Sequence, residues 1–375
     1  MTVGFLVGPD GNLESGKWFQ VPTKGEHLAK LAEEQLKSEK VLVEASTSGK
    51  AVARFLKEVG VDVDLVGSDI LLSSLRRQKT DKLDARDLAR IALLGGYKTS
   101  YVASPQEEAL RSLVRHAHAL TQQMTDTQNQ VKAIPQRNLL QEPQGSLRHH
   151  HVRRRWRQLP LPPAEARVLE EKLQLIEHFQ ERVDATKLQL HQALNENEDL
   201  HLLLTIPGLD VYSCAAILGE CGDMNRFPTA KKVAAYAGIV PRLSQSGGIT
   251  RNGKITKNGP SLLRHALIQA AHRIVKQPGR LRNKYTRLHT RTGKKRALVA
   301  IARTLITTVW SMLVNRNPYQ GQDPDAAAAK KWRNHHITKL MEAGEPEKAL
   351  RLLRTMDVKR AHKSWLNGRS RLVPG

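Results

Sequence analysis

Cysteine is almost absent from this sequence: Cys214 and Cys221 are the only two in 375 residues. They lie in a segment with a helical pattern and lack the C-x-x-C spacing typical of zinc and redox motifs, so we interpret them as reduced core residues. Long apolar runs are missing too, since none approaches the roughly 20 residues of a membrane span. The first residues lack the charged lead of a secretory signal, so we expect a cytoplasmic protein with no membrane partner.

Acidic residues are scarce relative to basic ones, with 36 Asp and Glu against 60 Lys and Arg, a formal net charge of +24. Such an excess favours a polyanionic partner, and nucleic acid is the one we expect, although a ribosome-associated or merely basic protein fits the same composition. The fifteen histidines include a run from His149 to His151. We interpret this run as a polyanion contact or a solvated loop, because no cysteine lies near it to complete a zinc site.

Residues 1–104 have the pattern of an α/β domain with a mixed sheet. A strong turn signal, Gly-Pro-Asp-Gly-Asn at 8–12, separates the first two extended segments and predicts a hairpin. Helical and strand patterns then alternate. In chain order we expect strands at 3–7 and 13–21, a helix at 28–36, a strand at 40–44, a helix at 51–59, a strand at 61–66 and a helix from residue 80.

Residues 105–200 are expected to form a helical coiled-coil arm. Two long segments with apolar residues at helical spacing, 105–140 and 163–197, could form an antiparallel hairpin or a dimer contact. The proline-rich basic loop between them, 141–163, is a candidate nucleic-acid contact, because cations around one Trp suit phosphate binding and base stacking. A disordered basic linker is the alternative. The residues singled out here are Arg154, Arg155 and Trp156.

Residues 201–318 predict a mainly α-helical domain, followed by an appended helical tail at 319–375. A Pro-Gly turn at 206–208 resembles a helix-hairpin-helix, whose backbone amides can hold a phosphate, although an ordinary helical corner is the alternative. The glycine-rich segment 239–259 predicts a phosphate-facing loop, in which Ser244 and Ser246 are the candidate hydroxyl nucleophiles. The alternative for Ser246 is solvent-exposed filler. The cations expected to contact nucleic acid are Arg251, Lys254, Lys257 and, in the next helix, Arg264.

Asp81 and Asp84 open the helix that begins after Thr80. Residues three apart on a helix point the same way, so the two carboxylates would make half of a cation site. Glu44 ends an apolar strand, and the carboxyl edge of a sheet is where α/β sites are built. The alternative is that the acids merely favour the helix dipole, with Thr80 as the N-cap and Asp84 paired with a neighbouring cation.

Three features in this order make the sequence closely resemble the transposases of the insertion-sequence-110 family, also called DEDD transposases. They are the strand ending in Glu44, the run Lys79-Thr80-Asp81-Lys82-Leu83-Asp84-Ala85, and a later series from Ile206-Pro207-Gly208 through Gln245-Ser246-Gly247 to Leu263-Arg264. The resemblance covers residues 1 to about 318. It implies a RuvC-like N-terminal domain of RNase H fold, a helical insertion, and a C-terminal transposase domain with a nucleophilic serine.

The resemblance also implies partners and a cofactor. In that family four acids, in the order Asp, Glu, Asp and Asp, hold Mg²⁺, and an element-encoded bridge RNA pairs with target and donor DNA. Glu44, Asp81 and Asp84 match the last three acids, and Ser246 matches the serine. The basic loop around Trp156 would be a reasonable contact for the RNA.

The first family acid has no match. It sits on an opening strand, whereas residues 3–12 resemble the second strand and its turn, and Asp10 in that turn is not a convincing substitute. Either the start is late, or the copy is decayed and the first strand is absent. Losing one ligand and a central strand should weaken both metal binding and folding, so we expect the chain as written to be poorly active.

The expected activity is Mg²⁺-dependent cutting and rejoining of DNA, with Ser246 attacking phosphorus. Because Ser246 and the acids lie in different domains, a homodimer or homotetramer is expected. One alternative is a structure-specific nuclease, in which water attacks and Ser246 only binds phosphate. Another is a nucleic-acid-binding protein without catalysis, whose affinity would depend on salt but not on Mg²⁺.

Overall fold

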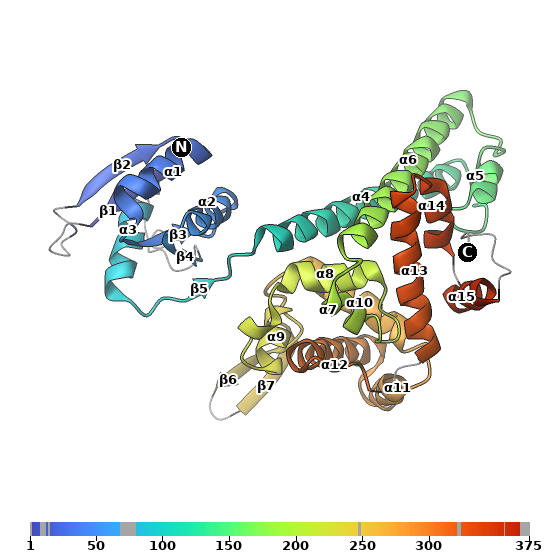
Figure 1. Cartoon of the computed structure of the whole chain (residues 1–375). Helices are drawn as coiled ribbons and strands as arrows, with labels where there is room; N and C mark the ends of the chain where they lie inside the picture. Colours follow the sequence, from blue (N-terminus) through green and yellow to red (C-terminus); the bar gives the residue numbers. More distant parts are fainter. Residues whose placement is uncertain are drawn as a thin grey trace. The chain divides into compact units, whose positions relative to one another are not determined.

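The protein was analysed as a computed structural model, which describes residues 2–7, 13, 16–67, 80–246, 249–320, 324–355 and 357–367. At residues 2, 3, 6, 243–246 and 249–252 the description is limited to the backbone. The chain forms two compact units, Met1–Gln106 (unit 1) and Glu107–Gly375 (unit 2). Figure 1 shows unit 1 as a small mixture of strands and helices, and unit 2 as mainly helical.

Unit 1 contains two small sheets. Strand β1 (Thr2–Leu6) pairs antiparallel with β2 (Lys17–Val21), which confirms the predicted opening hairpin. The turn signal at 8–12 lies outside the described residues. Strand β3 (Lys40–Glu44) pairs in parallel with β4 (Asp62–Val66), and β4 pairs antiparallel with β5 (Thr99–Ser100). The second sheet is therefore mixed, as the sequence predicts, and this α/β arrangement is consistent with an RNase H-like domain.

Three helices cover these sheets. Helix α1 (Gly25–Leu31) continues into a π-helical turn (Ala32–Leu36), and α2 (Thr47–Glu58) connects β3 to β4. Their apolar faces and the inner side chains of β4 form one buried core. Helix α3 (Asp81–Leu94) contacts both β1 and β3, so it bridges the two sheets.

The arm of unit 2 is a helical hairpin. Helix α4 (Pro105–Arg137) and α6 (Pro163–Ala193) lie side by side in Figure 1, and their apolar residues share a core. Arg137 contacts Glu165 and Lys172 contacts Gln130, so the helices run antiparallel. The prediction that 141–163 is a loop is wrong in part, because α5 (His150–Trp156) forms within it.

The rest of unit 2 is a helical core with one hairpin. Strands β6 (Pro241–Ser246) and β7 (Ile249–Ile255) pair antiparallel, so the glycine-rich segment predicted as a loop contains a hairpin. Cys214 and Cys221 are free and buried, as expected. The helices of this core are α7 (Glu198–Leu203), α8 (Val211–Cys221), α9 (Ala230–Tyr236), α10 (Ser261–Ile274), α11 (Arg280–Thr292) and α12 (Lys294–Asn315).

Helix α12 corrects the statement that no apolar run approaches a membrane span. Within the described part of the chain it is the one helix long and apolar enough to cross a membrane by length and composition. Its buried residues, Ile301, Leu305 and Val309 among them, belong to the main core of unit 2.

The C-terminal residues are part of unit 2 and not an appendage. Helix α13 (Pro324–Glu342) packs on α6, and α14 (Pro346–Arg354) packs on both α13 and α6. Helix α15 (Val358–Leu366) completes a small core with them. Lys330 of α13 donates to the backbone oxygens of Leu204 and Ile206, which ties this region to the turn after α7.

Candidate functional site

Helix α3 presents the two predicted acids at its start. The Thr80 hydroxyl accepts a hydrogen bond from the Leu83 amide at 3.3 Å, so Thr80 is the N-cap that its sequence position predicts. Asp81 is exposed, whereas Asp84 is only 7 % exposed. The first turn of a helix, near the positive end of its dipole, is a common position for Asp and Glu. The cap and the dipole account for the position of both acids, but neither requires Asp84 to be buried.

Glu44 is the last residue of β3, and its neighbours fix the strand end. The Ser46 hydroxyl accepts from the Gly49 amide at 3.0 Å and caps α2. A Cβ at Gly49 would lie 2.0 Å from the Glu44 carbonyl oxygen, so only glycine lets α2 begin this close to β3. The backbone at Glu44 is therefore held tightly where the parallel strand ends.

Glu44, Asp81 and Asp84 line one cavity of about 360 Å³ in unit 1. The cavity also borders β1 through Gly4 and Phe5, and much of its remaining wall is apolar. Among the described residues no group of three His, Cys, Asp or Glu side chains is close enough to hold a metal ion. The structure thus brings the three predicted acids to one cavity without gathering them into a finished ligand set.

The buried acid of this cavity is not satisfied. Asp84 Oδ1 is buried and has no hydrogen-bond partner within the described structure. An unpaired buried carboxylate oxygen is costly, so native proteins rarely keep one without a cation or a functional reason. The alternative that Asp84 pairs with Lys82 or Arg86 finds no support here, since no such ion pair forms among the described side chains.

Sequence reasoning missed the cation and the hydroxyls at the edge of this cavity. Lys40 lines it and contacts Asp62 at 2.8 Å and Asp64 at 3.0 Å, and hydrogen bonds to these two acids raise the pKa of Lys40 to about 12. Ser46 and Ser48 also line the cavity. Their proximity to Glu44 in the strand and the following turn was the signal that could have identified them.

Ser246 is the last residue of β6, and its backbone pairs with Ile249 of β7. Its side chain lies outside the described residues, as does that of Arg251, and residues 247 and 248 lie outside them entirely. Lys254 on β7 and Lys257 beyond it are exposed. The predicted serine therefore sits near the tip of a basic hairpin in unit 2, whereas the acids are in unit 1.

Arg264 has a structural role that the sequence did not reveal. Its Nη1 lies 3.3–3.4 Å from the backbone oxygens of Ala237, Asn258 and Gly259. The two glycines at this junction, Gly238 and Gly259, have positive φ and would clash with backbone if they carried a Cβ. Arg264 therefore fixes the segment that follows the hairpin, and nucleic-acid contact by its remaining nitrogens stays a prediction.

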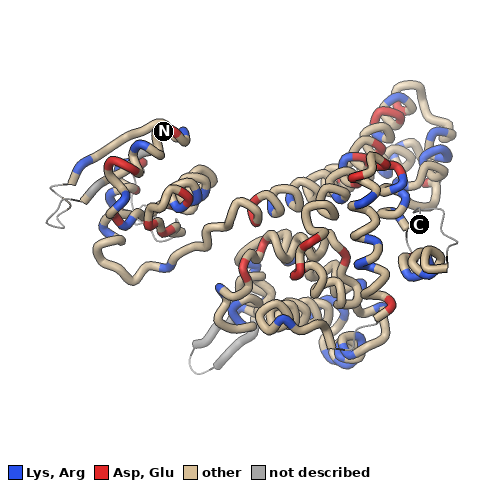
Figure 2. The backbone as a smooth tube through the Cα atoms, viewed as in Figure 1, with Lys and Arg blue, Asp and Glu red and all other residues tan. Residues whose placement is uncertain are grey.

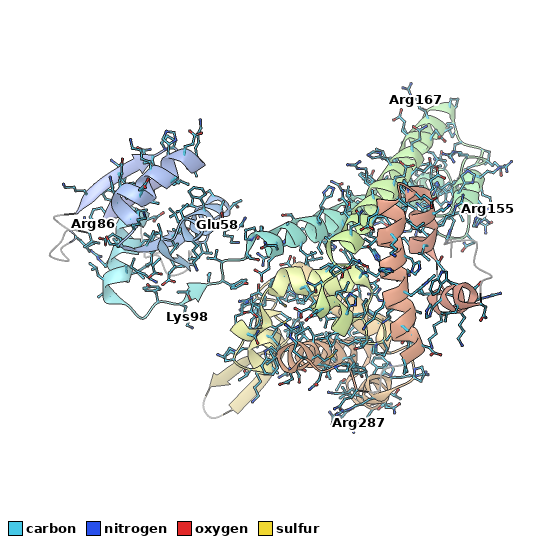
Figure 3. The ribbon with its side chains drawn as sticks, in the orientation of Figure 1. Glu58, Arg86, Lys98, Arg155, Arg167 and Arg287 are labelled. Atoms are coloured by element: carbon cyan, nitrogen blue, oxygen red, sulfur yellow. The ribbon has the colours of Figure 1, made fainter. Side chains whose placement is uncertain are left out.

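The predicted contacts in the arm divide into two groups. Trp156 is fully buried in the core shared by α4, α5 and α6. The prediction that a base stacks on its ring is therefore wrong, because the ring is not accessible. Arg154 and Arg155 are exposed, and Figure 3 shows Arg155 at the outer side of the arm. Figure 2 shows Lys and Arg along α5 and α11, two helices of unit 2.

At the Pro-Gly turn, residues 206–208, the structure favours an ordinary helical corner over a phosphate-binding helix-hairpin-helix. Asp210 caps α8 by accepting from the Ser213 amide at 2.9 Å, and it contacts Arg273 at 2.6 Å. Burial acts to raise the pKa of Asp210, but the charge of Arg273 and the bonds from Ser213 outweigh it and lower the pKa to about 2. An ionised carboxylate already occupies the start of α8, where a bound phosphate would have to lie.

Two family models match this chain. The IS110-type DEDD transposase model, described as "Transposase", matches residues 7–137, which include all three candidate acids. A second model, described as "Transposase IS116/IS110/IS902 family", matches residues 200–286, which include Ser246 and the β6–β7 hairpin. The two models cover separate parts of the chain in the order expected from the resemblance.

The chain is also similar to several proteins named as transposases. The chain is 28% identical over 243 residues to a probable family 20 transposase of Pseudomonas aeruginosa, covering 63% of this chain and 71% of the relative. It is 24% identical to the transposase for insertion sequence element IS1328 of Yersinia enterocolitica, covering 72% and 82%. It is also 24% identical to the transposase for IS1111A of Coxiella burnetii, covering 75% and 79%.

Proposed function

This chain belongs to the IS110 family of DEDD transposases, and we propose that it cuts and rejoins DNA strands with the acids of unit 1 and Ser246 of unit 2. The observation that carries this proposal is the cavity shared by Glu44, Asp81 and Asp84, with Asp84 buried and one of its oxygens unpaired. A structural acid would have a partner. An acid that serves a reaction can remain unpaired until its ligand arrives.

The proposed cofactor is Mg²⁺, held by Glu44, Asp81 and Asp84. The donor chemistry fits, because hard divalent cations prefer carboxylate oxygens and Asp84 Oδ1 lacks another partner, but the three side chains would have to move closer together to share one ion. A bound ion would supply Lewis-acid polarisation of the scissile phosphate. The cavity walls would keep bulk water away from Glu44 and Asp84, which are less exposed than Asp81. The exclusion of water would strengthen electrostatic interactions at the site.

The proposed nucleophile is Ser246. Its hydroxyl oxygen attacks phosphorus and forms a phosphoserine ester, while the bond from phosphorus to the leaving DNA oxygen breaks and that oxygen takes a proton. The hydroxyl of a second DNA strand then attacks the same phosphorus and releases the serine. Exposed Lys254 and Lys257, together with Arg251, would offset the negative charge on the transferring group.

The first acid of the family, for which this sequence has no match, would have a natural place in unit 1. Among the described strands, β1 pairs with β2 alone and β3 with β4 alone, yet α3 contacts both β1 and β3. The cavity lies against these two strands. A further strand would pair with their free edges, as in other cases of strand addition, and an Asp on it would enter the cavity as the fourth ligand.

The proposal also concerns partners. Since Ser246 and the acids belong to different units, a complete site requires both units to meet on DNA, within one chain or between subunits, so a homodimer or homotetramer is expected. A guide RNA is the further proposed partner. Exposed Arg154 and Arg155 would be its contacts, without Trp156.

The test is capture of a covalent protein–DNA adduct. The chain, with and without an added N-terminal strand bearing Asp, is incubated with Mg²⁺ and labelled element ends, then denatured. We expect weak adduct formation by the 375-residue chain and a strong increase with the added strand. Ser246→Ala should abolish the adduct, whereas Ser244→Ala on the same strand should keep it. An adduct that survives in Ser246→Ala excludes the serine.

One observation favours a second function. Because no three-residue ligand group forms within the described residues, the chain as written could bind nucleic acid without cutting it. That function predicts strong, salt-sensitive binding that Mg²⁺ and Asp84→Asn leave unchanged, together with no adduct under any condition. A nuclease would instead release cleaved DNA with no protein attached.

A further inference from the structure

Unit 2 contains a second cavity, of about 860 Å³, which none of the predicted site residues lines. It lies between α11, α12 and residues 317–320. We propose that this cavity binds an unpaired nucleic-acid strand, with phosphates on the cations of α11 and a base against Tyr319. The proposal does not depend on the chemistry at the acids, and its test is made without Mg²⁺.

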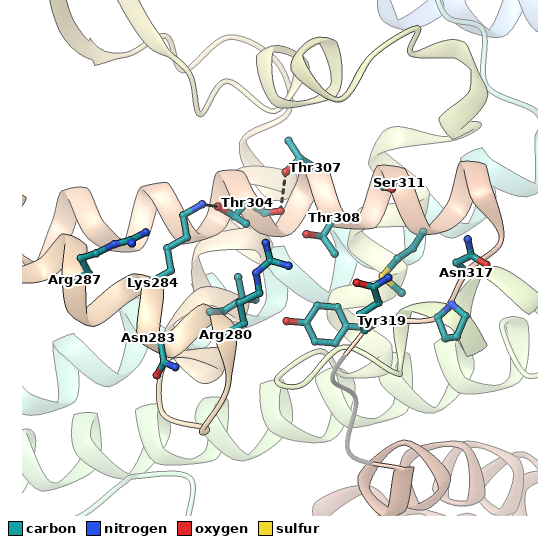
Figure 4. Close-up of a pocket in the computed structure, with 14 residues that line it drawn as sticks. Arg280, Asn283, Lys284, Arg287, Thr304, Thr307, Thr308, Ser311, Asn317 and Tyr319 are labelled. Carbon is teal, nitrogen blue, oxygen red and sulfur yellow. Dashed lines mark hydrogen bonds between the residues drawn. The ribbon is translucent and has the colours of Figure 1, made fainter.

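Helix α11 provides the charge. Arg280, Lys284 and Arg287 line the cavity, and their spacing of four and then three residues places them on one face of the helix. The lining includes no Asp or Glu, and none of the three cations forms an ion pair among the described residues. Figure 4 shows all three beside α12. The cations are close together without an acid between them, which suits a polyanion.

Lys284 shows the effect of this crowding. Burial lowers its pKa, and the charges of Arg280, Arg287 and Arg303 lower it further. Its Nζ donates to the Thr304 hydroxyl at 2.8 Å, a neutral partner that does not balance the charge. A phosphate placed here would relieve the repulsion and restore the pKa of Lys284.

Helix α12 presents hydroxyl groups to the same cavity. They come from Thr304, Thr307, Thr308 and Ser311, which recur at helical spacing on the side away from the buried residues Ile301 and Leu305. Exposed faces of core helices are usually charged, and a solvated row of hydroxyls is the plain alternative here. The hydroxyls of Thr304 and Thr307 already donate to backbone oxygens of α12, at 2.9 and 2.8 Å. Opposite a row of cations, however, the hydroxyls of Thr308 and Ser311 can donate to phosphate oxygens or to the sugar.

Tyr319 forms the aromatic wall. Its amide donates to the Thr205 hydroxyl at 3.1 Å, which holds residues 317–320 against the helical core. Burial raises the pKa of Tyr319, while the charge of Arg280 acts against that rise. In Figure 4 the Tyr319 ring and the Arg280 side chain lie beside the same space.

The combination favours an unpaired strand over a duplex. Aromatic stacking needs an open base, which a duplex buries between its neighbours. The volume is within the range of pockets that enclose small ligands, so a few nucleotides can enter while a duplex would meet only the rim. The shared chemistry is a sugar-phosphate strand with an exposed base, and either DNA or RNA can supply it.

The test compares Arg287 with Arg282. Both are exposed arginines on α11, but Arg282 lies on the opposite face and does not line the cavity. Binding of labelled 12-nucleotide single-stranded DNA and RNA of one sequence is measured by anisotropy over a range of salt. Arg287→Ala should weaken binding and reduce the slope of log affinity against log salt by about 0.7, the value per phosphate contact on a single strand. Arg282→Ala should change neither.

Two further variants separate charge from stacking. Replacing Arg280, Lys284 and Arg287 together by Ala should reduce the salt slope by about 2. Tyr319→Ala should weaken binding about tenfold with little change in the salt slope. Tyr319→Phe, which keeps the aromatic ring, should bind as tightly as wild type. Because Tyr319 packs against the core, ultraviolet crosslinking of a bromouridine-containing strand to wild-type protein is the companion measurement. The crosslinked peptide should contain Tyr319.

Preference for RNA or for DNA would identify the source of the strand. The proposal is overturned if Arg282→Ala and Arg287→Ala weaken binding equally, or if a duplex binds more tightly than both single strands. A crosslink that maps to a peptide outside the cavity also overturns it.

Discussion

The buried acids of the two units differ in one respect. In unit 2, Glu220 and Asp184 are 2 % and 3 % exposed, and each meets an arginine: Arg115 at 2.7 Å for Glu220 and Arg354 at 2.6 Å for Asp184. In unit 1, Asp84 is similarly buried, but its Oδ1 has no partner in the described structure. The paired acids stabilise contacts between helices, whereas the unpaired one lines a cavity with three further acids, Glu39, Glu44 and Asp81. Burial alone therefore does not identify a functional acid; for Asp84 the evidence is an unpaired oxygen together with a position on the cavity wall.

The largest expected effect is on the reaction. Asp84→Asn keeps the shape of the side chain but removes a charged ligand, so DNA cleavage should fall by about a thousandfold, as expected when several kcal/mol of transition-state stabilisation are lost. Nucleic-acid binding should be unchanged. Glu58→Gln, an exposed acid of unit 1 that does not line the cavity, is the matched control. Cleavage that survives in Asp84→Asn would show that Asp84 is not a functional acid.

The paired acids should report on stability instead. Arg115→Ala leaves Glu220 buried without its partner, and because Arg115 itself is half-exposed we expect a loss of about 3 kcal/mol in the free energy of unfolding, at the low end for a broken buried pair. The control is Arg167→Ala, whose partner Glu171 is exposed, with an expected loss below about 0.5 kcal/mol. Chemical denaturation of unit 2 measures both, and equal losses would contradict this explanation.

A buried histidine should make unit 2 sensitive to acid. Burial, with a contribution from Arg333, lowers the pKa of His191 from 6.5 to about 4. The unfolded chain therefore binds the proton more readily, so stability is complete above pH 6.5, declines as the pH falls, and has lost about 2 kcal/mol by pH 5. His191→Gln should remove this decline, whereas substitution of the exposed His149 should not. Thermal melting from pH 7 to pH 4 provides the measurement.

The smallest expected effect is a gain in stability, whereas the preceding predictions are losses of activity or stability. In metal-free buffer Asp84→Asn should raise the free energy of unfolding of unit 1 by about 1 kcal/mol, because it removes an unpaired buried charge. Asp184→Asn in unit 2 should lower it, because that carboxylate accepts two bonds from Arg354. If both variants lose stability, Asp84 has a structural partner and the contrast between the units disappears.

Local sequence signals correctly predicted where α3 begins and where β3 ends. Thr80 caps α3 and β3 ends at Glu44, as the sequence indicates, because caps and strand ends depend on adjacent residues. Burial of Asp84 was not predictable. It depends on how α3 packs on β1 and β3, which lie far away in the chain.

Tertiary context reversed two other predictions. Prolines and cations between 141 and 163 suggested a loop, but Trp156 packs into the arm core and Arg153 pairs with Glu177, and these contacts stabilise a short helix. Between 239 and 259, strand pairing overrode the glycines. The cavity beside α11 shows the same limit, because neither the shared helical face of its cations nor the position of Tyr319 opposite them was predicted.

Binding of Mn²⁺, a paramagnetic substitute for Mg²⁺, tests the central claim without requiring activity. Electron paramagnetic resonance should detect one site in the wild-type chain, which Glu44→Gln and Asp84→Asn each weaken strongly and Ser246→Ala leaves intact. An added Asp-bearing strand should tighten it. Equal Mn²⁺ affinity in wild type and Asp84→Asn would contradict the assignment of this cavity as the metal site.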